Sequence, residues 1–210
     1  MKKFIALAMM ALALPLTAMA AQFEEGTHYE VVSERASRKP EVKEFFSFYC
    51  PACNAYEGLL LDVKPKLDSE VKFKRSHVNF MGGRSAENQD MLSQALATAD
   101  VLPQKEQLVG AIFSHIHTKR AKFNEVADVK DIFVANGVDA DKFDKLFSGF
   151  AVRTKASKMQ RDQEYFKSKG ALSAVPTFIV NGKYRLILGR ESGVTEPDDI
   201  AALINFLSKK

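Results

Sequence analysis

The chain has 210 residues, of which 46% are hydrophobic. This length fits one large domain, or one domain with an insertion, and the apolar content is ordinary for a globular protein. The 30 basic and 26 acidic side chains leave a formal charge of +4, an excess too small to indicate nucleic-acid binding. There are two cysteines, Cys50 and Cys53, so no third thiol is left over for a structural bridge.

The N-terminus has the pattern of an export signal. Two lysines follow the first methionine, residues 4–14 form an apolar run too short to span a bilayer, and small residues lead up to Ala20. We expect residues 1–20 to be a bacterial signal peptide that is cleaved after Ala20 and directs the protein to the periplasm. The alternative is an uncleaved membrane anchor, which Pro15 and the short run disfavour.

The first third of the mature chain predicts a β-α-β unit. A short strand is expected at 29–34, and a second strand at 42–49 is apolar on both faces, as an interior strand of a covered sheet is. After Cys50 the apolar period becomes helical, and Pro65 should kink or end that helix. A further strand is expected at 71–78. The two cysteines therefore lie where the second strand ends and the helix begins.

The middle of the chain, residues 84–150, contains no convincing strand. Four apolar stripes at helical spacing predict four helices, and the third should end at Asn136-Gly137. Asp139 or Asp141 should cap the start of the fourth. We therefore expect an all-helical subdomain, followed by one more helix at 152–168.

Strands resume near the C-terminus. Asn181-Gly182 between two alternating apolar runs, 177–180 and 183–188, predicts a β-hairpin. A final amphipathic helix is expected, with a capping box formed by Thr195 and Asp198. The predicted order is β-β-α-β, a helical insertion, and α-β-β-α.

The cysteine pair has three interpretations: a redox couple, half of a zinc site, or two inert thiols. Zinc would need two further ligands, and two of the available histidines are only two residues apart, so on a helix they would point in different directions. A bridge across so short a loop removes little entropy from the unfolded chain and would be a poor structural staple. These considerations favour redox chemistry, although zinc stays open. The histidines are His28, His77, His115 and His117.

The position of Cys50 predicts its chemistry. At the start of a helix, its sulfur would meet unpaired N–H groups and the positive end of the helix dipole, which stabilise a thiolate. Pro51 suits the first helical position because its missing N–H loses nothing there. Cys53, one turn inside the helix, should be more buried. We expect Cys50 to be exposed and reactive and Cys53 to be the resolving cysteine.

Three segments together resemble the DsbA family of periplasmic thiol:disulfide oxidases, and the resemblance covers the whole mature chain. It implies a thioredoxin-like α/β fold at 21–82 and 152–210, interrupted by a helical insertion at 83–151. It also implies a monomer that oxidises thiols of newly exported proteins, needs no cofactor beyond the Cys50–Cys53 disulfide and binds no metal, and is reoxidised by a DsbB-like quinone-linked membrane oxidase. The segments are 44–53 (EFFSFYCPAC), 77–83 (HVNFMGG) and 175–184 (VPTFIVNGKY).

The resemblance also suggests supporting residues. It implies that the Val175-Pro176 bond is cis, faces the cysteines and offers backbone hydrogen bonds to a substrate. Glu44 falls on an apolar strand face, where a carboxylate would have a raised pKa and could exchange protons with Cys53, and Arg75 could be its partner. Ala52 departs from the family, which usually has His there, so the protein should be a somewhat weaker oxidant.

Two other functions remain open from the sequence. The same chemistry run in reverse would make the protein a disulfide reductase or isomerase. A non-catalytic binding module with an apolar groove would not need Cys50 at all.

Overall fold

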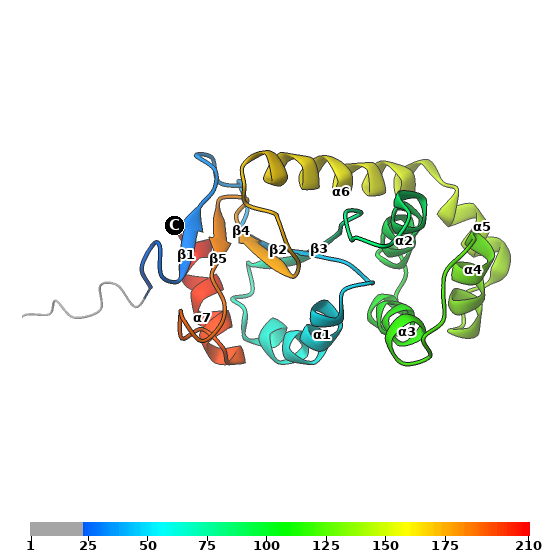
Figure 1. Cartoon of the computed structure of the whole chain (residues 1–210), viewed down its shortest axis with the longest axis horizontal. Coiled ribbons are helices and arrows are strands. Elements are labelled where there is room, and N and C mark those ends of the chain that lie inside the picture. Colours follow the sequence, from blue (N-terminus) through cyan, green and yellow to red (C-terminus); the bar gives the residue numbers. More distant parts are fainter. Residues whose placement is uncertain (1–22) are drawn as a thin grey trace, which may run out of the picture.

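The structure, a computed structural model, describes residues 23–210 (Figure 1). The expected signal peptide and its cleavage site after Ala20 lie outside the described residues. Within them, no helix combines the length and the apolar character that crossing a membrane requires.

Five strands form one mixed sheet in the order β1-β5-β4-β2-β3 (Figure 1). β2 and β3 are parallel, whereas the other neighbouring pairs are antiparallel. β2 is paired on both sides, as its two apolar faces predict. The strands are β1 (Tyr29–Val31), β2 (Glu41–Phe46), β3 (Lys72–His77), β4 (Thr177–Val180) and β5 (Tyr184–Leu186).

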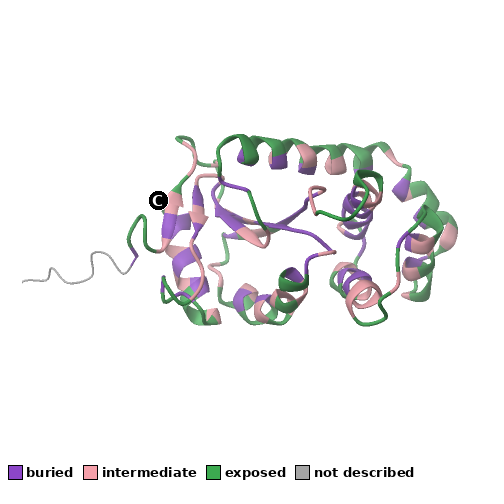
Figure 2. Ribbon diagram, in the orientation of Figure 1, coloured by how far each residue is buried: buried purple, intermediate pink, exposed green. Residues whose placement is uncertain are grey.

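Helices cover both faces of the sheet. α1 (Pro51–Val63) and α7 (Pro197–Ser208) bury one face in a core that includes Val42, Leu60 and Leu203. α6 (Phe150–Ser168) covers the other face, where Phe166 packs edge-on against Phe45 at 5.3 Å between ring centroids. The resulting layers are visible as buried strands between partly exposed helices (Figure 2).

Four helices follow β3 and pack beside the sheet, towards the right of Figure 1. Their apolar side chains join Phe46, Phe48 and both cysteines in a single buried cluster. The two cysteines therefore lie at the boundary between the sheet and these helices. The division of the chain at 83–151 stays a prediction, and α6 begins two residues earlier than expected. The helices are α2 (Ala86–Ala99), α3 (Lys105–His117), α4 (Val126–Ala135) and α5 (Ala140–Phe147).

Local signals explain most boundaries. α1 ends just before a short 3₁₀ helix, η1 (Lys64–Lys66), because Pro65 cannot continue its hydrogen-bond ladder. Asp139 caps α5 by accepting from the Lys142 N–H at 2.8 Å, as predicted. Asn181 and Gly182 both have positive φ, so the hairpin between β4 and β5 is of the type that their sequence favours.

Several boundary predictions were wrong. The strand expected at 29–34 ends at Val31, and the strand expected at 183–188 covers only Tyr184–Leu186. β2 ends at Phe46, and residues 47–49 form a turn instead of continuing the strand. The predicted capping box at Thr195 is absent, because α7 begins at Pro197 and its N-cap is Glu196. Proline has a fixed φ and no N–H, so it suits the first helical position and moves the start of the helix one residue along.

Candidate active site

Cys50 lies where β2 has ended and α1 begins, and it is the N-cap residue of that helix. Its Sγ accepts a hydrogen bond from the backbone N–H of Cys53 at 3.3 Å, and Pro51 occupies the first turn. The turn that precedes it is held by the Cys50 N–H, which donates to the Ser47 carbonyl at 3.0 Å. The sulfur therefore faces the unpaired amide end of α1, as the sequence predicts.

The expected exposure of Cys50 was wrong. Only 5% of Cys50 is accessible, compared with 0% of Cys53, so both are buried and the asymmetry is small. The cause is the segment before β4, since the Cys50 Sγ lies 3.4 Å from the Val175 carbonyl and donates to it. Sequence periodicity could not predict that a segment 125 residues away would cover the sulfur.

The Val175–Pro176 peptide bond is cis, as the resemblance implies. Both residues are half-buried, and Val175 packs against the cluster that contains the two cysteines. Its backbone therefore lies at the mouth of the site, next to Cys50, which is the partly accessible member of the cysteine pair.

Burial raises the pKa of the Cys53 thiol, and the nearby Cys50 and Glu44 raise it further, against a backbone hydrogen bond at Ser47 that lowers it. Cys53 therefore holds its proton at neutral pH. To act as a nucleophile or to close a disulfide, it must lose that proton inside the protein, where a base has to be present.

Glu44 is a buried carboxylate that raises the pKa of Cys53, so it is the candidate for this base. It is 0% exposed and points to the α1 side of the sheet, and burial raises its pKa although Arg75 lowers it. The Arg75 Nε lies 2.8 Å from the Glu44 Oε2, and its other nitrogens reach Glu57 on α1 at 2.5 and 3.2 Å. The Glu44 contact is an ion pair without good hydrogen-bond alignment, whereas Glu57 makes a two-bond fork.

Sequence reasoning paired Glu44 with Arg75 but missed three other side chains. Glu57 lies one turn after Cys53 on α1, and that spacing was a usable signal. His77 is buried and donates to or accepts from Ser93 Oγ at 2.9 Å, and burial lowers its pKa to about 3, so it is neutral. His117, the last residue of α3, donates from Nε2 to the Phe48 carbonyl at 2.8 Å, a contact that no local pattern indicates.

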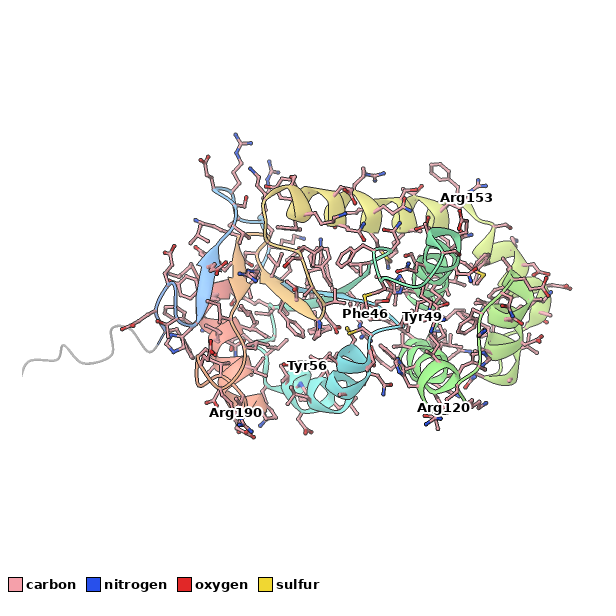
Figure 3. All side chains as sticks on the ribbon, viewed as in Figure 1. Phe46, Tyr49, Tyr56, Arg120, Arg153 and Arg190 are labelled. Atoms are coloured by element: carbon pink, nitrogen blue, oxygen red, sulfur yellow. The ribbon has the colours of Figure 1, made fainter. Side chains whose placement is uncertain are left out.

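The aromatic side chains Phe46 and Tyr49, labelled in Figure 3, lie where the sheet meets the helical insertion. Phe46 also lies under the Arg75 guanidinium, at 4.0 Å from ring centroid to carbon. An aromatic ring thus covers the buried guanidinium, and a site with little water strengthens the electrostatic interactions within it.

Ala52 is exposed beside Cys50, so the effect of the missing histidine can be tested directly. Ala52→His should make the reduction potential about 30 mV more positive near pH 6, because a protonated imidazole that stabilises the thiolate by about 1.4 kcal/mol favours the reduced pair. Equilibration with glutathione measures the potential, and Ala52→Gln is the uncharged control. A histidine variant no more oxidising than the glutamine variant would contradict the prediction.

Cys50 caps the start of α1, and Cys53 is buried one turn into the same helix. A cis-proline faces the pair, and the helix packs on a mixed sheet. Thioredoxin-fold thiol:disulfide oxidoreductases carry their redox disulfide in this arrangement, and this chain is of that class. Residues 41–204 match the family described as the DSBA-like thioredoxin domain. The chain belongs to this DsbA family, and it is a protein thiol:disulfide oxidoreductase.

Individual relatives agree with that assignment. The thiol:disulfide interchange protein DsbA of Haemophilus influenzae is 38% identical over 176 residues, which cover 82% of this chain and 81% of the relative. DsbA of Escherichia coli K12 is 35% identical over 189 residues, covering 89% and 86%. Among solved structures, Proteus mirabilis DsbA with a non-covalently bound peptide, PWATCDS, superposes with a TM-score of 0.76 at 26% identity, covering 90% of this chain and 100% of that one. A non-catalytic binding module is therefore set aside.

Proposed function

We propose that the protein donates its Cys50–Cys53 disulfide to reduced, newly exported proteins through a mixed disulfide at Cys50. A client thiolate attacks the Cys50 sulfur, the Cys50–Cys53 bond breaks, and Cys53 leaves as a thiolate that takes up a proton. The client's second thiolate then attacks the client sulfur of the mixed disulfide, and Cys50 leaves as a thiolate. The client loses two electrons and two protons as its disulfide forms, and the cysteine pair gains the two electrons.

The observation that carries this proposal is the contact between the Cys50 Sγ and the Cys53 N–H at the start of α1. Amide groups directed at the sulfur stabilise its anion, and a stabilised thiolate is a good leaving group. Cys53 has no exposed surface, so a client thiol can reach only Cys50. Attack at Cys50 and departure of Cys50 are therefore both favoured.

The client is proposed to lie in an extended conformation across Val175 and Pro176. The Val175 carbonyl already accepts from the Cys50 sulfur, so a backbone bound beside it would place a client cysteine next to that sulfur. Proteus mirabilis DsbA, a structural neighbour, binds a cysteine-containing peptide non-covalently, which supports a peptide as the client.

Glu44 is proposed to exchange the proton of Cys53, and Arg75 to hold Glu44 in place. Burial raises the pKa of the Glu44 carboxyl as well as that of the Cys53 thiol. The pKa of Glu44 therefore lies closer to that of Cys53 than the pKa of a solvent-exposed carboxyl would, which favours proton transfer between them. Pro51 is proposed to fix the start of α1, and Ala52 to leave the position beside Cys50 without a charge.

Location and partners complete the proposal. The signal-like first 20 residues support export to the periplasm, where exported proteins with free thiols would be the clients. Reoxidation would come from a DsbB-like quinone-linked membrane protein, and the working form would be a monomer. The disulfide itself would be the only redox group.

Trapping tests the mechanism. Cys53→Ala, first converted by oxidised glutathione to a mixed disulfide between Cys50 and glutathione, should accumulate mixed disulfides with client proteins that have one free thiol. The client thiolate attacks the Cys50 sulfur, glutathione leaves as a thiolate, and without Cys53 no internal thiol can reverse the new bond. Non-reducing electrophoresis of periplasmic extracts would detect these species, and reduction should release them. Cys50→Ala is the matched control and should trap nothing. Equal trapping by both variants, or by neither, would contradict attack at Cys50.

The direction of transfer is tested separately by the reduction potential. A donor of disulfides should be clearly more oxidising than thioredoxin, whose potential is about −270 mV. A value as low as that would favour a reductase or isomerase.

A further inference from the structure

A second site lies away from the cysteines, on the opposite face of the sheet. A cavity of about 490 Å³ opens between the β3 edge, α6 and the turn that joins α2 to α3. Lys43 on β2 and Lys74 on β3 are register partners and belong to the face that α6 covers, whereas Glu44 and Arg75 point to α1. The cavity is thus separate from the redox site.

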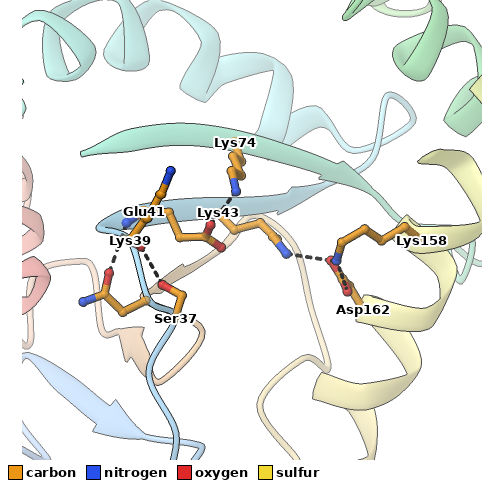
Figure 4. Close-up of polar contacts among 8 residues, drawn as sticks. Ser37, Lys39, Glu41, Lys43, Lys74, Lys158 and Asp162 are labelled. Atoms are coloured by element: carbon orange, nitrogen blue, oxygen red, sulfur yellow. Dashed lines mark hydrogen bonds and ion pairs between the residues drawn. The ribbon is translucent and has the colours of Figure 1, made fainter. Parts of the chain in front are cut away.

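Its lining carries more positive than negative charge. Two aspartates are each held by two lysines, so each group has one positive charge in excess, and the fifth lysine pairs with a glutamate. Figure 4 shows the group around Asp162 and the pair of Glu41 with Lys74. The Arg75 guanidinium is neutralised on the other face and adds nothing. The ion pairs are Asp100 with Lys105 (2.7 Å) and Lys155, Asp162 with Lys43 (2.6 Å) and Lys158 (2.7 Å), and Glu41 with Lys74 (2.5 Å).

The excess charge lies at the rim of the cavity. The carboxylates of Asp100 and Asp162 are 7% and 20% exposed, whereas the side chains of Lys155 and Lys158 are 43% and 60% exposed. These two lysines are three residues apart on α6 and therefore neighbours on one helix face. A ligand entering the cavity would meet ammonium groups before it meets carboxylates.

A buried polar group on the floor has no partner. Ser76 is 2% exposed and lines the cavity, and its Oγ makes no hydrogen bond within residues 23–210. An unpaired buried hydroxyl is costly unless something binds to it. Met159 gives the same cavity an apolar side chain, whereas Phe73, which also borders the cavity, packs its side chain against the core on the α1 and α7 side.

We propose that this cavity is a binding site for a small organic dianion, with its acidic groups on Lys155 and Lys158, a hydrogen bond from Ser76, and an apolar body against Met159. Each group of one aspartate and two lysines carries one net positive charge, and the two groups together match the two negative charges of a dianion. The volume fits a small molecule and is within the usual range for such sites. This site is independent of the proposed oxidase mechanism.

Isothermal titration of the mature protein with phenyl phosphate tests the proposal. This probe is a dianion at neutral pH and carries an aromatic ring, and phenol is its neutral analogue. Phenyl phosphate should bind and phenol should not, and added sodium chloride should weaken the binding by screening. Succinate, a dicarboxylate without a ring, shows whether the site favours the phosphate ester or the carboxylate source of the charge, and either preference supports a dianion site.

Two variants locate the binding. Lys155→Gln should weaken the affinity for phenyl phosphate about threefold to tenfold, because one partly exposed charge is lost while Lys105 still pairs with Asp100. Ser76→Ala should weaken it by a similar factor without lowering the unfolding midpoint, because its hydroxyl makes no contact that the fold would lose. Lys167→Gln is the matched control, a lysine on the same helix with 41% side-chain exposure that does not line the cavity.

Three results would overturn the proposal. They are no heat of binding with either dianion, equal binding of phenol and phenyl phosphate, and an affinity that Lys155→Gln and Ser76→Ala leave at the level of Lys167→Gln. Unfolding midpoints of all variants show that each is folded. If one variant is not, the other still decides the outcome.

Discussion

Replacing Arg75 with methionine should lower the free energy of unfolding by about 3 to 5 kcal/mol, the usual cost of removing one partner of a buried ion pair. The Arg75 side chain is 1% exposed and serves two carboxylates, of which Glu44 is completely buried. No water can replace the lost guanidinium beside Glu44 without opening the core. Urea unfolding at neutral pH measures the loss.

The cost of Arg75→Met should also depend on pH. Burial already raises the pKa of Glu44, and removing Arg75 removes the main opposing cause, so the folded chain keeps this proton to a higher pH than the unfolded chain, where the group ionises near 4.5. The folded state then binds more protons, so the free energy of unfolding falls as pH rises from about 4.5 to the folded pKa. The variant should lose stability over this range more steeply than the wild type.

Lys74→Met is the control for Arg75→Met. Lys74 lies next to Arg75 on β3, but its side chain is 52% exposed and its pair with Glu41 reaches solvent. Loss of such a surface pair costs about 1 kcal/mol or less, and no extra pH dependence near Glu44 is expected. Equal losses in the two variants would show that burial does not make the Arg75 network special.

Glu44→Gln should slow the reoxidation of the reduced cysteine pair about a hundredfold, the lower end of what a positioned base contributes. The Cys53 thiol must lose its proton as the disulfide re-forms, and burial raises its pKa. Glu44 is the buried carboxylate that senses Cys53, and a carboxylate with a raised pKa is the stronger base. Stopped-flow oxidation of the reduced protein by oxidised glutathione measures this rate.

The pH profile distinguishes a base from a structural role. Glu44 accepts a proton only in its ionised form, so the wild-type rate should fall as pH falls through its raised pKa, and the glutamine variant should lack that step. Glu41→Gln, on the same strand but on the other face, should keep both the rate and the step. A Glu44→Gln profile parallel to the wild-type profile would rule out proton exchange through this residue.

The sequence predicted the fold well because its local signals agree with its long-range contacts. Pro65 ended a helix, Asn181-Gly182 made a hairpin, and Asp139 capped a helix, each through chemistry confined to a few residues. The failures were also local: Thr195 lost the cap position to the residue before Pro197. Such competition between two good start signals cannot be decided from either signal alone.

The site was predictable in part, for a different physical reason. Strand alternation placed Glu44 on a buried face, and helix geometry placed Cys50 at an N-terminus. The cover over Cys50 from Val175 and the contact of His117 with the Phe48 carbonyl arise from the packing of distant segments. No periodicity reports such pairings, so the sequence overestimated the exposure of the reactive sulfur.

The order of strands has a consequence for how the chain matures. β2 is hydrogen-bonded to β4 through residues 42–45, yet all of the helical insertion and α6 lie between them in the sequence. A chain that emerges N-terminus first therefore presents both thiols long before Val175 arrives to shield them. During that interval the two thiols of the nascent chain are unshielded. They can then react with oxidants and with copies of the protein that have already folded.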